Sequence, residues 1–233
     1  MTELEDTTYD YQYESNDPYV YPGTRVLINK FGFVNQEQLS KTERLLSFSR
    51  ELQLRTQRLP GNYDLAHLQA FHKFLFDEIY DWAGQIRQQG FLSKNQTIFC
   101  GAQFIIPYSN VFFRQLKNEN YLRGMNKSDF IEHVTFYMGE INALHPFREG
   151  NGRTQRAFIA QLGRDAGWEL NLHLADKNEL CEAYIATERR DYTPLTTILN
   201  DTMVPYRKQS IQKDTSSVEI AGINRAQTKR RSR

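Results

Sequence analysis

The stretch "HPFREGNGRTQR", residues 145–156, decides how the fold of this chain is interpreted. It places one imidazole, one carboxylate, a Gly-Asn-Gly run and three arginines within twelve positions. Apolar residues with a helical period stand on both sides of it. We therefore expect a tight loop between two helices, with many polar groups gathered at one place.

The helix before this loop is the most strongly patterned in the chain. From Ser128 onward an apolar stripe recurs at helical spacing and delivers His145 at its end. Pro146 disfavours continuation of that helix, and a new helix is expected over residues 151–167. The stripe consists of Phe130, Ile131, Val134, Tyr137, Met138, Ile141 and Leu144.

Helical patterns account for most of the remaining chain. They predict helices over residues 36–58, from Asp64 to a C-terminal glycine at Gly84, and over residues 111–122. Two further helices begin with Asp176, which has Glu179 in capping-box spacing, and at Thr193. Between residues 85 and 105 the helical period is lost, and "SKNQT" separates two short apolar runs, which predicts a hairpin. The fold class is therefore mainly α, a helical bundle that carries one small β-hairpin.

The segments outside this bundle have a different composition. Residues 1–35 contain "DPYVYPGT" and few periodic apolar positions, so we expect an irregular arm that lies mostly on the surface. Residues 36–207 form the expected domain, with the hairpin segment at about 85–105 and the loop at 145–156. Residues 208–233 are polar and unpatterned, and are expected to be a disordered tail or the start of a further module.

Bulk composition excludes several classes of protein. The 233 residues carry a formal charge of +1, with 39% hydrophobic and 24% charged content and no run of eighteen apolar residues. Such a chain is expected to be soluble, without a membrane span and without the broad basic surface of a nucleic-acid binder. Cys100 and Cys181 are too few and too far apart for a disulfide framework or a thiolate zinc site. A reduced, cytosolic setting is expected.

The Gly-Asn-Gly run has the chemistry of an anion-binding site. Gly150, Asn151 and Gly152 open a helix, where backbone N–H groups lack intrahelical partners, and glycine lets a ligand approach the backbone closely. Arg153 and Arg156 lie three residues apart, on one face of the helix, and can add charge-assisted hydrogen bonds. This pattern indicates binding of a polyphosphate.

Glu149 and His145 indicate a metal ligand and a general base beside this anion-binding site. A carboxylate beside bound phosphate is repelled unless a divalent cation lies between them, so Glu149 is the expected Mg²⁺ ligand. His145 is the one group of the stretch with an ordinary pKa near neutrality, about 6.5, so it is the expected proton acceptor. The inferred reaction has a hydroxyl attacking a phosphoryl centre. The other histidines, His67, His72, His133 and His173, are expected to be surface or hydrogen-bonded core residues.

The stretch resembles, position for position, the H-x-F-x-[D/E]-G-N-G-R-x-x-R signature of Fic-domain proteins. The similarity extends from about Val20 to Val204, since "YDWAGQIR" resembles the run that leads into the Fic flap and "SKNQTIFCGAQF" lies where the hairpin is expected. Such domains are helical bundles with a flap. The matching positions are His145, Phe147, Glu149, Gly150, Asn151, Gly152, Arg153 and Arg156.

The resemblance implies transfer of AMP from ATP to a Ser, Thr or Tyr hydroxyl of another protein. His145 then deprotonates the hydroxyl, and Glu149 holds Mg²⁺ against the phosphates. Asn151 and the local backbone of Gly150 and Gly152 bind the α-phosphate, while Arg153 and Arg156 hold the leaving pyrophosphate. Phe147 anchors the loop in the core. The target docks on the flap, at Ser93, Lys94, Asn95, Gln96, Thr97, Ile98 and Phe99.

The resemblance also implies which group is transferred, how the activity is inhibited and where the protein acts. Glycine at position 152, where a phosphotransferase branch of the family carries lysine, favours nucleotidyl transfer. Many relatives are restrained by a helix with the motif [S/T]-x-x-x-E-[G/N]; Glu119 and Glu149 precede Asn and Gly, but neither has Ser or Thr four residues earlier. A separate small antitoxin-like chain is therefore the expected inhibitor. The effector-like arm favours a bacterial protein that acts on a host small GTPase, in the bacterial cytoplasm or, once secreted, in the host cytosol.

Two alternatives remain open at this point. The chain could transfer another nucleotide or phosphate-linked group, because only the base pocket would differ. It could also be a nucleotide-sensing interaction module without catalysis, although the complete motif argues against that. A zinc protease is excluded because His145 has no histidine partner four residues away, and a P-loop is excluded because no Lys-Ser or Lys-Thr pair follows a glycine-rich turn.

Overall fold

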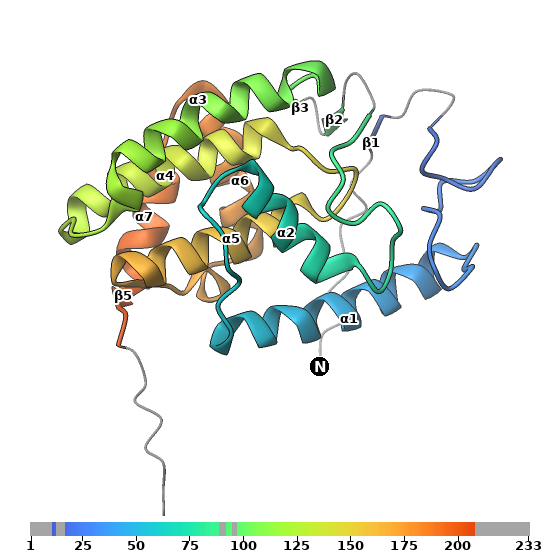
Figure 1. The fold of residues 1–233 in the computed structure, drawn as a ribbon, viewed down its shortest axis with the longest axis horizontal. Helices are drawn as coiled ribbons and strands as arrows, with labels where there is room; N and C mark the ends of the chain where they lie inside the picture. Colours follow the sequence, from blue (N-terminus) through green and yellow to red (C-terminus); the bar gives the residue numbers. More distant parts are fainter. Residues whose placement is uncertain (1–10, 13–16, 89–91, 95–96, 208–233) are drawn as a thin grey trace, which may run out of the picture.

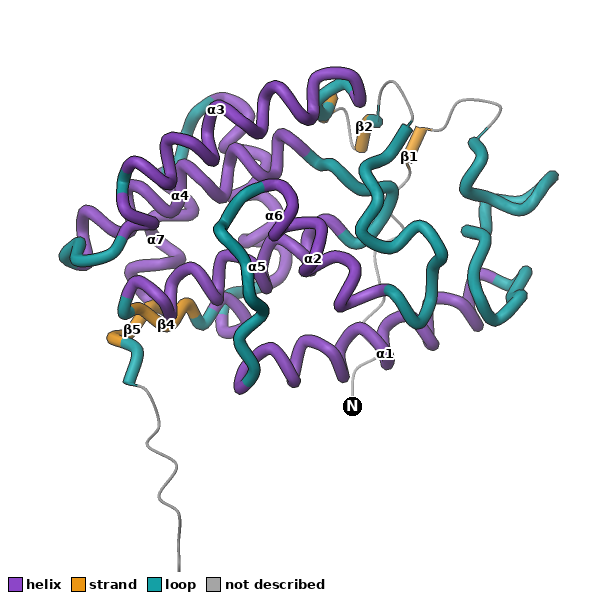
Figure 2. The backbone as a smooth tube through the Cα atoms, in the orientation of Figure 1, coloured by secondary structure: helices purple, strands orange, loops and turns teal. Residues whose placement is uncertain are grey.

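The computed structural model describes residues 11–12, 17–88, 92–94 and 97–207. Helices dominate this part of the chain, and short strands lie at its periphery (Figures 1 and 2). The mainly helical class predicted from the sequence is confirmed. The helices are α1 (Gln36–Thr56), α2 (Leu65–Phe76), α3 (Ile105–Asn118), α4 (Lys127–Leu144), α5 (Asn151–Ala166), α6 (Lys177–Ala186) and α7 (Thr193–Thr202), with 3-10 turns at Ala102–Phe104, Asn120–Leu122, Leu172–Leu174 and Thr187–Arg189.

Two small antiparallel sheets accompany the helices. The predicted hairpin is confirmed as β2 (Ser93–Lys94) and β3 (Thr97–Ile98). A strand that the sequence did not indicate, β1 (Tyr11–Gln12), pairs with β2, so the strand order is β1-β2-β3. A second sheet pairs β4 (Trp168–Leu170) with β5 (Met203–Pro205) and joins the ends of α5 and α7.

The core lies around α4 and α5, the helices on either side of the candidate loop. The apolar stripe predicted for α4 is buried throughout, and α2, α3 and α7 pack their own apolar faces around it. Helix α1 runs along one side of the bundle against α2 and α5 (Figure 1). Burial of this apolar surface is the main force that fixes the two helix ends that meet at the loop. The central buried residues are Phe71, Leu75, Val134, Tyr137, Met138, Phe158, Ile159, Leu162, Leu195 and Leu199.

Helices α2 and α3 differ from the sequence predictions in their boundaries, and α3 also ends at Asn118 and not at 122. The helix capped by Asp64 ends at Phe76 instead of continuing to Gly84. The Ile79 carbonyl, which a longer helix would use internally, accepts from the Lys30 backbone N–H at 2.8 Å, so the chain turns there although Ile79 is buried. Helix α3 begins at Ile105, before Pro107, because proline is tolerated in the first turn.

The N-terminal arm is more closely attached than expected. Most of residues 17–35 are exposed or half-buried, as predicted, but Val26, Leu27 and Asn29 are buried. Lys30 ties the arm to the turn after α2 through its backbone and through Nζ, which donates to the Asp77 carbonyl at 2.6 Å. Among the helices of the described residues, none has the length and apolar content needed to cross a membrane.

Candidate active site

The candidate loop joins the C-terminal end of α4 to the N-terminal end of α5. His145 closes α4 in a left-handed conformation, with φ 41° and ψ 60°, and its N–H donates to the Ile141 carbonyl at 3.2 Å. Gly150, with φ 79°, opens α5. His145 is not a glycine, so its left-handed backbone conformation is strained. Such strain persists only where neighbouring groups hold the residue in place. The groups that fix His145 therefore matter for its role.

Arg87 and Phe99 hold His145 from two directions. Arg87 Nε donates to the His145 carbonyl at 2.9 Å, and the Arg87 backbone N–H donates to the Pro146 carbonyl at 2.9 Å. The Arg87 guanidinium also donates to the Cys100 carbonyl, at the base of the flap. The Phe99 ring stacks on the His145 imidazole, with 3.6 Å between centroids. Arg87 is the last residue of "YDWAGQIR", but nothing in this local stretch indicates its role.

Asn151 closes the loop on itself. Its side-chain oxygen accepts from the Phe147 N–H at 2.9 Å, and its amide nitrogen donates to the Phe147 carbonyl at 2.7 Å. The Phe147 side chain is buried, which confirms it as an anchor. Because both groups of the Asn151 amide are used inside the loop, this side chain shapes the site.

His72 supports the same loop from α2. Its Nδ1 accepts from the Gly84 N–H at 2.7 Å, so the ring donates through Nε2 to the Glu149 carbonyl at 2.9 Å. The imidazole stacks on Phe147 with 4.0 Å between centroids. Burial, with a smaller effect of nearby Arg153 and against the hydrogen bond to the Glu149 carbonyl, lowers the pKa of His72 to about 3. The neutral ring is thus a hydrogen-bonded core residue, as predicted.

The start of α5 has the geometry of an anion-binding site. The first intrahelical bond runs from Thr154 N–H to the Gly150 carbonyl at 3.0 Å, so the preceding N–H groups of the helix have no intrahelical carbonyl to reach. The Gly150 N–H has no intrahelical partner, as expected, but it is not available to a ligand here because it donates to Glu149 Oε1 at 2.9 Å. A Cβ at Gly152 would lie 3.3 Å from Arg156 Nη1, so the Arg156 guanidinium lies beside this helix start.

Arg153 is oriented by α1, which sequence reasoning did not connect with the site. Its guanidinium donates to the Glu43 carboxylate, and to Ser47 Oγ at 3.0 Å, and it lies 4.7 Å over the Phe76 ring. The Glu149 carboxylate is 3.8 Å from the same guanidinium. Burial alone would lower the pKa of Arg153, but Glu43 and Glu149 outweigh it and raise the pKa.

One face of α1 therefore faces Arg153 and Arg156 of the motif. Glu43, Ser47 and Glu51 stand four residues apart, so they share one side of the helix. Burial raises the pKa of the Glu51 carboxyl, while Arg156 and Arg153 act in the opposite direction. Spacing alone could not have assigned these residues, because solvated helix faces carry the same pattern.

The surroundings of Glu149 suit a metal ion that is bound together with a nucleotide. Burial and the nearby Glu43 carboxylate raise the pKa of Glu149, against the effects of Arg153 and the Gly150 N–H, so a cation would relieve repulsion between two acids. Within the described residues, no group of three or more His, Cys, Asp or Glu side chains could hold a metal by itself. Mg²⁺ commonly uses one or two carboxylates together with substrate phosphates, and this donor set suits that arrangement.

The flap packs against the imidazole of His145 through Phe99. Strands β2 and β3 contain the predicted docking residues Ser93, Lys94, Thr97 and Ile98, whereas Asn95 and Gln96 lie outside the described residues. Ile98 is 74% exposed, and the Phe99 side chain is buried against His145. The structure thus brings the flap and the loop together as expected.

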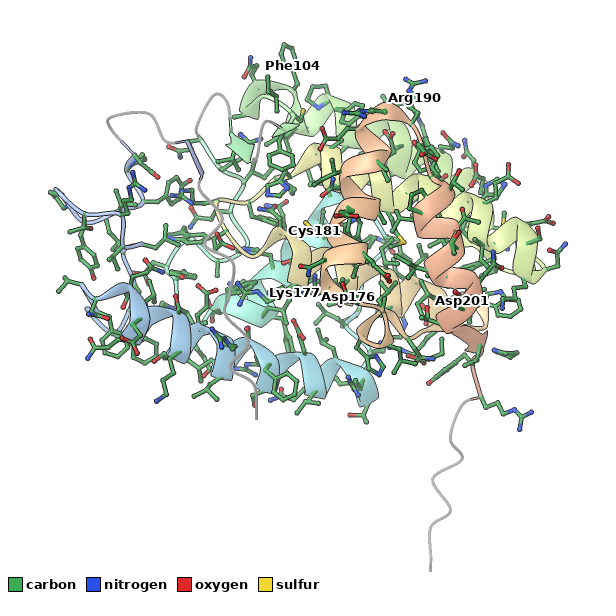
Figure 3. The ribbon with its side chains drawn as sticks, turned by 180° about the vertical axis from the view of Figure 1, so that it is seen from behind. Phe104, Asp176, Lys177, Cys181, Arg190 and Asp201 are labelled. Carbon is green, nitrogen blue, oxygen red and sulfur yellow. The ribbon has the colours of Figure 1, made fainter. Side chains whose placement is uncertain are left out.

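A hollow of about 490 Å³ opens between the flap and α3. Phe104 stands at its edge and projects from the molecule at the start of α3, seen from behind in Figure 3. Helix α6, which begins after Asp176 and carries Cys181, faces the viewer in the same picture. The hollow shares Phe99 with His145, so it adjoins the candidate site. Its lining consists of Ile98, Phe99, Cys100, Phe104, Pro107, Tyr108 and Ala143.

Comparisons with known proteins show which proteins the chain is similar to. Residues 62–162 match the Fic/DOC family. The chain is 38% identical over 183 residues to "Probable protein adenylyltransferase y4lH" of Sinorhizobium fredii, covering 77% of this chain and 92% of that protein. It is 39% identical over 171 residues to "Protein adenylyltransferase VbhT" of Bartonella schoenbuchensis, covering 73% of this chain and 36% of VbhT. The chain therefore spans about a third of VbhT but nearly all of y4lH.

Solved structures share the fold. The BepC effector of Bartonella tribocorum, solved with bound AMPPNP, has a TM-score of 0.78 at 24% identity, covering 82% of this chain and 98% of that chain. The type IV secretion system effector BepA has a TM-score of 0.73 at 30% identity, covering 81% of this chain and 69% of that chain. The chain thus shares its fold with these effector proteins. Together with the 38% identity to y4lH across nearly its full length, this shows that the chain belongs to the Fic/DOC family.

Proposed function

We propose that this chain is a protein adenylyltransferase that uses ATP. A Ser, Thr or Tyr hydroxyl oxygen of the target attacks the α-phosphorus of ATP. A bond forms between that oxygen and the phosphorus, the bond to the bridging oxygen of the β-phosphate breaks, and pyrophosphate leaves. The hydroxyl proton passes to His145. AMP is thereby attached to the target.

The observation that carries this proposal is the meeting of His145, Glu149 and the N-terminus of α5 in one loop beneath a hairpin. A base, an acidic group and an anion-binding helix end are the components that nucleotidyl transfer needs, since such reactions depend mostly on positioning and charge neutralisation. Two relatives that match over nearly their full length are named probable protein adenylyltransferases. Both lines of support are independent of one another.

Each residue of the site then has a role. His145 takes the proton. The N–H groups at Asn151 and Gly152 bind the α-phosphate, while the Asn151 side chain keeps the loop in shape. Arg153 and Arg156 bind the β- and γ-phosphates of the leaving group. Glu149 would hold Mg²⁺, which neutralises phosphate charge when it is bound.

The larger organisation follows from the same interpretation. Residues 36–207 form the catalytic domain and residues 1–35 its arm; residues 208–233, a tail or the start of a further module, lie outside the described residues. The target docks on the flap, and a host small GTPase is the proposed target, reached by secretion from the bacterial cytoplasm into the host cytosol.

A separate antitoxin-like chain with [S/T]-x-x-x-E-[G/N] is the proposed inhibitor. Its glutamate is proposed to pair with Arg156, the second arginine of the motif, whereas Arg153 donates to Glu43 on α1. Binding of such a chain would therefore leave the contact between Arg153 and α1 in place.

Incubation with α-labelled or γ-labelled ATP, Mg²⁺ and a eukaryotic lysate tests the proposal, with His145→Ala in parallel. We expect protein labelling from the α position alone, lost in the variant, because a general base commonly contributes about 10²–10⁴-fold to the rate. Nucleotide binding should persist in His145→Ala. Label from the γ position would mean phosphotransfer. No label from either would favour another nucleotide or the interaction module and would contradict the proposal.

A further inference from the structure

The flap is held by a segment far from it in the sequence. Strand β1 pairs antiparallel with β2, with Tyr11 opposite Lys94 and Gln12 opposite Ser93 (Figure 1). Strands β2 and β3 each contain two residues. A hairpin this short is marginal in water by itself, and a third strand adds main-chain hydrogen bonds to it. The N-terminal segment therefore helps to order the flap.

The same segment is tied to the candidate active-site loop. Asp17 follows β1 by five residues and forms an ion pair with Arg148, inside the motif, at 2.7 Å between Oδ2 and Nη2. Both side chains are almost fully buried, 4% and 1% exposed respectively. A buried pair of this kind is a geometrically specific contact, because neither charge can be left without its partner. The segment thus links the loop to the flap.

The strand order determines which edge of the flap remains available. Strand β2 is occupied on both sides, by β1 and β3. In the described part of the chain, no strand pairs with the outer edge of β3. Strand β3 leads directly into Phe99, whose ring stacks on His145. Strand β1 lies two strand spacings from β3, about 10 Å, so it does not cover that edge.

We propose that strand β1 (Tyr11–Gln12), held to the loop by Asp17, is a brace that orders the flap and presents the outer edge of β3 beside His145 to an extended segment of the target. Asp17 is the positioning residue that locks the brace to the loop. Because the brace is already paired, a target that adds to β3 extends an ordered sheet and does not have to order the hairpin itself. The role in target docking rests on the proposed function, whereas the ordering of the flap does not.

Amide hydrogen exchange of the nucleotide-free full chain tests the brace without any enzymatic activity. Tyr11→Pro/Gln12→Pro removes the N–H donors of β1, and Tyr11→Ala/Gln12→Ala is the matched control that keeps them. We expect the proline pair to speed exchange in residues 92–99 about three- to tenfold, as loss of one or two hydrogen bonds predicts. Amides within α4 should keep their rates. Asp17→Asn should act like the proline pair, and Asp17→Glu should restore part of the protection.

Two results would overturn the brace: unchanged exchange of the flap in the proline pair, or equal acceleration in the flap and α4. Transfer kinetics on a protein that becomes labelled give the second readout. The KM for that protein should rise several-fold in the proline pair, while kcat and the Kd for ATP stay unchanged. If the wild-type chain labels nothing, the proposed function fails, and the exchange result still decides whether the brace exists.

Discussion

Arg87 Nε donates to the carbonyl oxygen of His145 at 2.9 Å, across 58 positions of sequence. The same buried side chain donates to the Cys100 carbonyl, and its backbone N–H donates to the Pro146 carbonyl. One arginine therefore fixes both the strained turn that carries the imidazole and the base of the flap above it. This makes Arg87 a positioning residue rather than one that contacts the nucleotide.

Replacing Arg87 should therefore impair transfer more than nucleotide binding. We expect Arg87→Ala to lower kcat roughly 10²-fold, because misplacement of a reacting group by about 1 Å costs this much. Arg87→Lys, which keeps the charge but loses the planar fork, should give an intermediate value. Steady-state transfer kinetics and the Kd for ATP measure the two effects. The exposed neighbour Gln88, replaced by alanine, is the control, and wild-type kcat in Arg87→Ala would contradict the assigned role.

Gly150 should tolerate no side chain. Its φ is 79°, and a Cβ there would lie 2.4 Å from Phe76 Cε2. Gly124 has nearly the same φ, 82°, but nothing within 4 Å of its Cβ position, so it isolates the backbone strain. We expect Gly124→Ala to lower the free energy of unfolding by about 1–2 kcal/mol. Gly150→Ala should cost about 1–3 kcal/mol more, because it adds overpacking. Urea unfolding measures both, and equal losses would show that Phe76 moves aside.

Because His72 is neutral in the folded chain, the free energy of unfolding should fall as the pH is lowered. Burial, with a smaller effect of Arg153, lowers its folded pKa to about 3, whereas an unfolded histidine titrates near 6.5. Below about pH 6.5 the unfolded chain binds the proton and the folded chain does not, so stability falls by about 1.4 kcal/mol per pH unit down to about pH 3. His72→Gln, which offers a donor and an acceptor but does not titrate, should be less stable at pH 7. Its stability should decline less between pH 6.5 and pH 5. Parallel pH profiles of the two unfolding free energies would contradict the assignment.

Target choice should depend on the side chains of the flap. Main-chain hydrogen bonds give an added strand affinity, whereas neighbouring side chains give it specificity. Exchanging residues 93–98 for those of another Fic protein, with Phe99 kept because it stacks on His145, should change which lysate protein is labelled. The rate of ATP binding should stay the same. An identical labelling pattern would place the determinants of target choice outside the flap.

The local sequence determined much of this molecule. Periodic apolar residues placed α1, α4 and α5 to within a few positions, and Pro146 and Gly150 placed the loop between the last two. The motif brought His145, Glu149, Arg153 and Arg156 into one region because they are near in sequence, and a helix end fixes their spacing. The hairpin followed from turn formers between apolar runs. In each case the information lay within a few residues.

The tertiary structure decided what holds these groups in place. Arg153 meets Glu43 across 110 positions, and Arg148 meets Asp17 across 131. Helix α2 ends earlier than the apolar period indicates, and the Lys30 N–H donates to the Ile79 carbonyl in the turn that follows it. Strand β1 joins a flap some eighty residues away in the chain. Such partners cannot be found from local periodicity, because a charged residue on a solvated face and one that meets a buried partner have the same local pattern. Only the packing of α1 and the N-terminal arm against the loop distinguishes them.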